Sequence, residues 1–211
     1  MESRIPENLL SILTRHIPPE RRLHKDCIAA CQSVLDELAT PEDIEAVCFH
    51  EAGHFIFAVL AGLDLGFAEE QIQMQAPWVR FKDGVFIPIP GSTDIPPMDE
   101  PKEWTTTLVT HYARVAMAGG VFAGRFANRP EKGTAGDVQT FEDYYRQACW
   151  ELFANANFLT ASKYQAQAKE FISDLLETDP TLGDLAKEKA KEYKLEHFIP
   201  FVDYAKDTKR S

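Results

Sequence analysis

The chain is organised around a single stretch, Ala46–Gly62, with the sequence AVCFHEAGHFIFAVLAG. It carries the pattern His-Glu-x-x-His, in which His50 and His54 are four residues apart and Glu51 follows the first histidine. From Ala52 to Leu63 the only polar side chain is that of His54. A helix of this composition is expected to be buried on most of its circumference, so the stretch predicts the central helix of the fold.

The spacing of the two histidines indicates a metal site. Residues four apart lie almost above one another on a helix, so His50 and His54 can share one ion. Imidazole nitrogens suit Zn²⁺, and a catalytic zinc site takes three protein ligands and keeps a fourth position for water. Glu51 lies about 100° round the helix from His50, where it can act as general base on that water. The pattern predicts a zinc-dependent hydrolase; in the alternative interpretation both histidines are core residues bonded to backbone groups.

Two histidines hold zinc poorly, so a third ligand is expected from elsewhere in the chain. Judged by residue type, the candidates are His111, Asp137, Glu142, Asp143 and Glu151. Asp137 opens a predicted helix just after a glycine-flanked turn, which would let it approach a metal. In the alternative interpretation, which composition alone favours, Asp137 complements the positive end of that helix.

Length and charge exclude several classes of protein. The 211 residues suit one domain with a helical extension. Thirty-three acidic against twenty-two basic residues give a net charge of −11, with no basic cluster, so nucleic acid is not an expected partner. The longest apolar run, Phe55–Leu63, is shorter than a bilayer span, and the N-terminus lacks a signal-peptide pattern. We therefore expect a soluble cytoplasmic protein without a membrane span.

The four cysteines do not form a disulfide pattern. Cys27 and Cys31 would suit a metal together with His24, but they lie on the apolar stripe of a predicted helix, and we assign them to the core. Cys48 and Cys149 lie in apolar helical surroundings, which argues against a nucleophilic cysteine.

Periodicity and capping residues predict the other helices. Thr40 and Pro41 predict the start of the central helix, which we expect to end near Ala61 with Gly62 as its left-handed stop. Gly53 in its middle costs about 1 kcal/mol relative to Ala, which indicates that another backbone passes close by. Further helices are predicted at about residues 6–16, 19–39, 102–127, 160–177 and 181–194, with another that follows Gly133–Asp137.

A period of two between these helices predicts three short strands, at 71–75, 78–82 and 85–90, with Asp83-Gly84 as a hairpin turn. Prolines confine the third strand to an edge, where an extended peptide could add itself by backbone hydrogen bonds. The alternative is a small sheet that merely covers the core. Residues 91–101 predict a loop above the site.

The order of these motifs resembles the peptidase domain of the FtsH family of ATP-dependent zinc metalloproteases. The resemblance rests on the His-Glu-x-x-His motif, a strand-rich stretch, a helix with Gly119-Gly120, and Gly133–Gln139 (GTAGDVQ), and it covers roughly residues 40–160. In that family two histidines and an aspartate bind zinc, and the glutamate is the general base. The resemblance therefore implies that His50, His54 and Asp137 bind Zn²⁺ and that Glu51 is catalytic. It also implies a hexameric ring.

The chain departs from the family in two respects. It contains no Gly-x-x-x-x-Gly-Lys-Ser/Thr segment, so it cannot thread substrates by its own ATP hydrolysis. Gly124 stands where the family carries an acidic residue, and Val138 replaces a leucine.

Together these features predict a mainly α fold with a small β-sheet (α+β), a zincin-like helical domain with the His-Glu-x-x-His helix at its centre. We expect an N-terminal helical arm (1–39), a zinc metallopeptidase-like core (40–160) and C-terminal helices packed on it (161–211). The predicted function is a zinc metalloendopeptidase acting on peptides or unfolded proteins. One alternative is a zinc-binding, catalytically weak interaction module that works with a separate ATPase or another partner. A homo-oligomer is the other partner considered. Another is a zinc hydrolase with a small non-peptide substrate.

Overall fold

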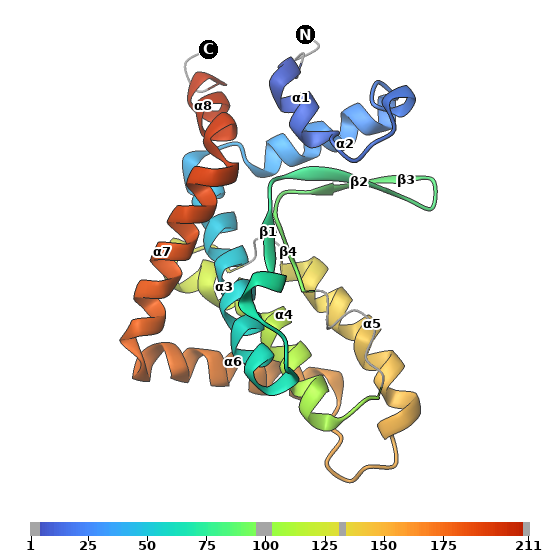
Figure 1. The fold of residues 1–211 in the computed structure, drawn as a ribbon, viewed down its shortest axis with the longest axis vertical. Coiled ribbons are helices and arrows are strands. Elements are labelled where there is room, and N and C mark those ends of the chain that lie inside the picture. The colour runs from blue at the N-terminus through green and yellow to red at the C-terminus, as the bar shows by residue number, and fades with distance from the viewer. Residues whose placement is uncertain (1–4, 96–102, 131–133, 209–211) are drawn as a thin grey trace.

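A computed structural model describes residues 5–95, 103–130 and 134–208 of the chain (Figure 1). The fold is mostly helical with two small antiparallel sheets of two strands each, which confirms the α+β class. In chain order the elements are α1 (Glu7–Leu13), η1 (Pro19–Arg21), α2 (Lys25–Glu37), α3 (Pro41–Leu65), η2 (Glu69–Gln71), β1 (Gln73–Gln75), β2 (Trp78–Lys82), β3 (Val85–Ile89), β4 (Ser92–Asp94), α4 (Thr106–Ala127), α5 (Thr134–Leu152), α6 (Ala161–Thr178), α7 (Pro180–His197) and α8 (Ile199–Thr208).

Helix α3 carries the histidine motif and is the longest element. The Thr40 side chain accepts a hydrogen bond from the backbone N–H of Asp43, as an N-cap does, and Pro41 occupies the first position. The predicted stop at Gly62 is wrong, because the helix continues to Leu65 and ends at Gly66, whose φ of 80° is left-handed. Gly62 instead lets the chain fold back, since a Cβ there would lie 2.8 Å from the carbonyl oxygen of Phe67.

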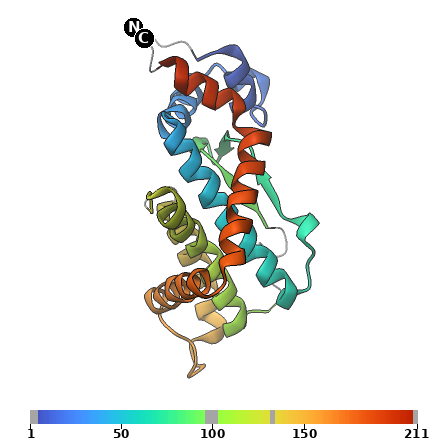
Figure 2. The same ribbon diagram turned by 90° about the vertical axis from the view of Figure 1, so that its left-hand side faces the viewer.

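Helices α4 and α7 pack along α3, as Figures 1 and 2 both show. At the crossing with α4, a Cβ on Gly53 would lie 2.8 Å from the carbonyl oxygen of Ala118. The close backbone approach predicted from Gly53 is therefore confirmed. By length and composition α3 alone among the described helices would suit a membrane span, but 83% of its apolar window is buried inside the protein. Packing within the fold accounts for its composition.

The two sheets follow one another along the same pair of chain segments. Asp83 (φ 51°) and Gly84 (φ 83°) make the predicted hairpin turn, with positive φ at both central positions. The register runs on from β2–β3 into β1–β4, interrupted at Ala76-Pro77 and Pro90-Gly91, where proline has no N–H to donate. Strand β4 was not predicted: the expected loop at 91–101 begins with it, and residues 96–101 of that prediction lie outside the described residues.

The N-terminal helices and the end of the chain share a core. Helix α1 lies beside α8, and α2 covers β2 and β3 (Figure 1). The predicted helix at 19–39 is shorter than expected, because residues 19–21 form η1 and His24 caps α2. Leu23, which precedes this cap, is 78% exposed, whereas Cys27 and Cys31, assigned to the core from the sequence, are fully buried as free thiols.

The predicted C-terminal helices correspond to α6 and α7, which pack on α4 and α3 respectively. Asp179 caps α7 by accepting a hydrogen bond from the N–H of Thr181 at 3.0 Å. A further helix, α8, was not predicted. It buries Phe201, Val202 and Ala205 in the same cluster as the N-terminal helices. The division of the chain into arm, core and C-terminal helices stays a prediction.

Candidate metal centre

Two elements far apart in the sequence bring three ligand groups together. His50 and His54 project from α3, and Asp137 projects from the first turn of α5. The His50 Nε2 and His54 Nε2 atoms are 2.9 Å apart. One Asp137 oxygen, Oδ2, lies 2.9 Å from His50 Nε2, and the other, Oδ1, lies 3.3 Å from His54 Nε2. One ligand atom from each residue lies within 4.8 Å of the others, so the group could hold a metal ion.

Glycines of α4 make this convergence possible. A Cβ on Gly119 would lie 2.6 Å from both His50 Nε2 and His54 Nε2, so only glycine lets α4 pass behind the ligand atoms. A Cβ on Gly120 would lie 2.7 Å from the hydroxyl of Thr134, at the start of α5. The hydroxyl of Thr134 in turn donates to the carbonyl of Pro130 at 2.6 Å. Gly119 thus leaves room beside α4 for the two histidines, and Gly120 leaves room for the first residue of α5, the helix that carries Asp137.

Backbone contacts orient the His54 imidazole. His54 Nδ1 lies 2.7 Å from the carbonyl oxygen of Val115, which can only accept a hydrogen bond. Nδ1 therefore carries the proton in the neutral ring, and Nε2 directs its lone pair at the other ligand atoms. Among the described residues, neither His50 Nδ1 nor Asp137 Oδ2 has a hydrogen-bond partner. Asp137 Oδ2 lies 2.9 Å from His50 Nε2, and the two atoms form an ion pair when the histidine is protonated.

Burial and charge act in opposite directions on the pKa values of this group. Burial alone would lower the pKa of His54, but the charge and hydrogen bond of Asp137 outweigh it and raise the pKa to about 9. Burial alone would raise the pKa of Asp137, but the facing histidines hold it well below its usual value. The site therefore favours a buried carboxylate facing positive charge, which a metal cation would also supply.

The donor set fits a zinc ion. Ligand atoms of one tetrahedral zinc lie about 3.3 Å apart when each bond is 2.0–2.1 Å. The three contact distances of 2.9, 2.9 and 3.3 Å are close to that spacing. Two imidazoles and one carboxylate also suit other divalent transition metals, so the geometry indicates a metal site without identifying the metal.

Glu51 lies beside this group and is held by β4. Its Oε2 accepts a hydrogen bond from the hydroxyl of Thr93 at 2.8 Å, and the same hydroxyl lies 3.3 Å from the Glu51 carbonyl oxygen. Gly91 also approaches it closely, since a Cβ there would lie 3.1 Å from Oε1. Although Glu51 is only 5% exposed, its side chain lines a cavity.

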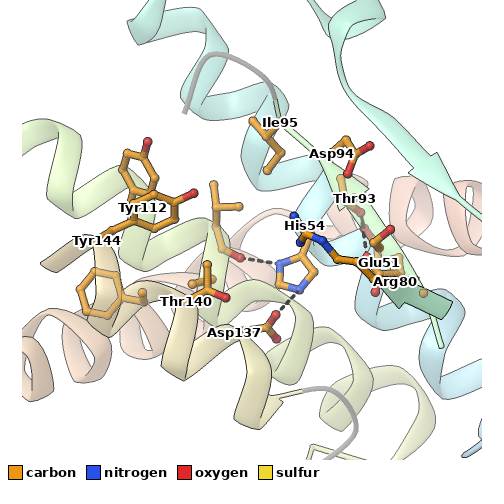
Figure 3. A pocket seen from close by; sticks show the side chains of 15 residues that line it. Glu51, His54, Arg80, Thr93, Asp94, Ile95, Tyr112, Asp137, Thr140 and Tyr144 are labelled. Atoms are coloured by element: carbon orange, nitrogen blue, oxygen red, sulfur yellow. Dashed lines mark hydrogen bonds and ion pairs between the residues drawn. The ribbon is translucent and has the colours of Figure 1, made fainter. Parts of the chain in front are cut away.

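This cavity, of about 330 Å³, is shared by Glu51, His54 and Asp137 (Figure 3). In Figure 3, Tyr112 and Tyr144 lie on one side of His54, and Glu51 lies with Thr93 on the other. A metal ion held by the three ligands would therefore be next to a carboxylate and would face a small cavity that opens to solvent.

The other candidate ligands lie elsewhere. His111 Nε2 lies 3.1 Å from Asp64, and Asp143 pairs with Arg146 at 2.8 Å. Glu151 accepts a hydrogen bond from the N–H of Trp104 at 3.2 Å. Glu142 is half-buried on α5. Across the described ranges, neither these residues nor His24 with its neighbouring cysteines form a group of three ligand atoms.

Gly124, at the position where the sequence departs from the resembled family, packs closely against Pro130. A Cβ at this position would lie 3.0 Å from the Cβ of Pro130. Pro130 therefore crowds any side chain placed at this position.

Three residues that shape the site were not predicted from the sequence. Val115 acts through its carbonyl oxygen, Thr93 belongs to the unpredicted strand β4, and Gly91 precedes it. The Gly119-Gly120 pair entered the sequence analysis only through the family resemblance, without any indication of its contact with the histidines.

No family model, no curated protein and no solved structure matches this chain.

Proposed function

We propose that this protein is a zinc metallopeptidase, with the zincin-like arrangement and the ligand set that its resemblance to the FtsH peptidase domain implies. The observation that carries the proposal is the convergence of His50, His54 and Asp137 within 4.8 Å, with Glu51 on the same cavity. Zinc is the metal proposed because two imidazoles and a carboxylate with an open fourth position are the ligand set of catalytic zinc sites.

Each residue has a role that follows from its position. His50, His54 and Asp137 would hold the zinc, which when bound lowers the pKa of a water molecule and polarises the peptide carbonyl. Glu51 takes the proton of the attacking water and passes it to the leaving amine. The hydroxyl of Thr93 holds one carboxylate oxygen of Glu51, which fixes the direction of the other. The carbonyl of Val115 keeps His54 in the required tautomer.

The proposal is tested by comparing the wild type with Glu51→Gln. Zinc content is measured by elemental analysis, and cleavage of a reduced, unfolded protein is followed by gel and mass spectrometry. We expect one zinc per chain in both proteins, and a loss of roughly 10²- to 10⁴-fold in cleavage rate for the variant. Full zinc occupancy with no cleavage of any substrate by the wild type would refute the peptidase proposal.

A second function, a zinc-bearing interaction module that works with a separate ATPase or assembles with itself, is favoured by a specific surface feature. Trp150 and Phe153, at the end of α5, are 87% and 79% exposed. The two residues are three positions apart, and neighbouring exposed apolar side chains that form a patch are typical of interaction surfaces. Cleavage only in a mixture with an ATPase would support this function, whereas full activity of the isolated chain would remove it. Cytoplasmic location is likewise a proposal.

A further inference from the structure

We propose that Arg15 and Tyr193 are positioning residues for Glu51, because their side chains fix the segment of chain that holds this carboxylate. The inference rests on the proposed function, in which Glu51 is the general base, and it adds two residues to that site. Both lie outside residues 40–160, so the family resemblance assigns them no role.

The contacts are made at the break between the two small sheets. Ala76-Pro77 and Pro90-Gly91 separate β2–β3 from β1–β4, and the strands change direction there (Figure 1). The carbonyl groups of Ala76 and Pro77 lie outside both ladders, and Pro90 has no N–H with which to bond across the break. Such carbonyl groups need hydrogen-bond donors from elsewhere in the fold.

Arg15, just after α1, supplies two of these donors. Its Nη1 donates to the carbonyl oxygen of Pro77 and its Nη2 to that of Ala76, both at 2.7 Å. The guanidinium is itself held, since Nη1 also donates to the carbonyl oxygen of Ile12 at 3.1 Å and Nε donates to His16 Nε2 at 3.0 Å. A planar guanidinium fixed in this way sets the position of both carbonyl groups.

Tyr193, on α7, holds the carbonyl group that precedes these two. Its hydroxyl donates a hydrogen bond to the carbonyl oxygen of Gln75, and the tyrosine is only 1% exposed. Arg15 and Tyr193 therefore come from opposite ends of the chain and hold three successive carbonyl groups, at residues 75–77. The end of β1 cannot shift without breaking at least one of these hydrogen bonds.

The strand held in this way pairs with the one that contacts Glu51. Met74 of β1 pairs with Thr93 of β4, whose hydroxyl donates to Glu51 Oε2 at 2.8 Å. Gly91, two residues before Thr93, also lies against the glutamate, since a Cβ there would lie 3.0 Å from Glu51 Cγ. Because β1 and β4 move together through their ladder, a displacement of β1 would disturb both of these contacts with Glu51.

Three variants test the inference by turnover of an unfolded protein substrate. Arg15→Met and Tyr193→Phe keep the bulk of each side chain without its donors, and Arg15→Lys keeps the charge but cannot hold two carbonyl groups as a planar fork. We expect kcat to fall about 3- to 10-fold for the Met and Phe variants and less for the Lys variant, because the base loses its alignment. KM should change by less than about 2-fold, because substrate binding is left intact.

The matched control is Arg22→Met. Arg22 belongs to the same N-terminal segment, but its Nε donates to the carbonyl oxygen of Ile17 at 2.9 Å, a contact within that segment. Its kcat should equal that of the wild type. Zinc content and thermal unfolding are measured for every protein, and we expect one zinc per chain throughout.

A second readout does not depend on turnover. The hydroxamate of acetyl-alanyl-leucine chelates zinc through two oxygens and can donate a hydrogen bond to a neighbouring carboxylate, so its Kd for the zinc-loaded protein reports on Glu51. We expect Arg15→Met and Tyr193→Phe to weaken its binding about 3- to 10-fold. In a Glu51→Gln background the same substitutions should change Kd by less than about 2-fold, because no carboxylate remains to be aligned.

The outcomes separate this inference from the proposed function. Unchanged kcat and Kd in all three variants would overturn the inference even if the protein cleaves peptides. The inference would also fall if the variants lose zinc, if all three are unfolded, or if they weaken the hydroxamate equally in the Glu51→Gln background. The expected pattern of Kd values without any cleavage by the wild type would support the positioning of Glu51 and refute the peptidase proposal. Wild-type protein that binds no zinc would overturn both.

Discussion

At the scale of single residues, the site depends on glycines at positions where a Cβ atom would clash with the side chains of the site. Gly119 passes behind both ligand nitrogens, and Gly91 lies against Glu51. The histidine motif was visible in the sequence because its spacing alone specifies the geometry. The glycines and Thr93 were not, because their roles depend on segments that meet only after folding.

Gly119→Ala should abolish tight zinc binding. Its Cβ would lie 2.6 Å from the two histidine nitrogens, so the rings must move away from the metal position. We expect zinc affinity to fall by at least roughly 10- to 100-fold, the range seen when the support of a ligand is lost. Affinity is measured by competition with a chromogenic chelator.

The control for this variant is Gly136→Ala. This glycine lies on α5, next to Asp137 in the sequence, but a Cβ there would meet nothing within 4 Å. Its zinc affinity should stay at the wild-type value, and its stability should rise by about 0.4–1 kcal/mol. Equal zinc binding by the two alanine variants would show that the ligand atoms do not lie where the structure has them.

Thr93→Val should lower turnover without lowering zinc content. The variant keeps the shape of the side chain but loses the 2.8 Å hydrogen bond from the hydroxyl to Glu51 Oε2. We expect kcat to fall about 10-fold with a smaller change in KM, because Glu51 would be held less well for proton transfer. Thr93→Ser restores the hydroxyl and should recover most of kcat. Serine and valine variants of equal activity would rule out this role for Thr93.

At the scale of elements, the sequence predicted the helices whose faces and caps are local properties. Thr40, Pro41 and the apolar run predicted α3, and Asp83-Gly84 predicted the turn between β2 and β3. The missed elements, β4 and α8, are short and owe their stability to partners: β4 pairs with β1, and α8 packs on the N-terminal helices. The approach of α5 to α3 also depends on tertiary packing, so from spacing and composition Asp137 remained one of five candidates.

Gly53→Ala tests the crossing of α3 with α4. Its Cβ would lie 2.8 Å from the carbonyl oxygen of Ala118, which belongs to a backbone that cannot move aside locally. We expect the free energy of unfolding to fall by about 1–3 kcal/mol, the usual cost of overpacking, despite the higher helix propensity of alanine. Urea denaturation measures this change. A variant as stable as the wild type would contradict the packing described here.

At the scale of the whole molecule, the metal should couple folding to pH. Without metal, His54 has a pKa of about 9 in the folded protein against an ordinary value of 6.5. The stability it contributes is complete below pH 6.5 and is lost as the pH rises through 9. The lowered pKa of Asp137 acts oppositely: its contribution is complete above its ordinary value of 3.8 and is lost as the pH falls below it.

The metal-free protein should therefore become less stable between pH 6.5 and 9, whereas the zinc-loaded protein should not. Zinc binds the deprotonated ligands, so raising the pH over this range strengthens binding and with it the stability of the folded state. Thermal unfolding across pH, with chelator or with excess zinc, measures both slopes. The same slope under both conditions would mean that zinc does not bind through His54.

The central claim is that one metal ion joins a motif on α3 to a carboxylate on α5. The most direct measurement is a crystal structure of the zinc-loaded protein with anomalous data collected at the zinc edge. We predict one strong anomalous peak at roughly 2.0–2.2 Å from His50 Nε2, His54 Nε2 and a carboxylate oxygen of Asp137. A zinc-loaded crystal with no peak at that position, or with the Asp137 side chain turned toward solvent, would contradict it.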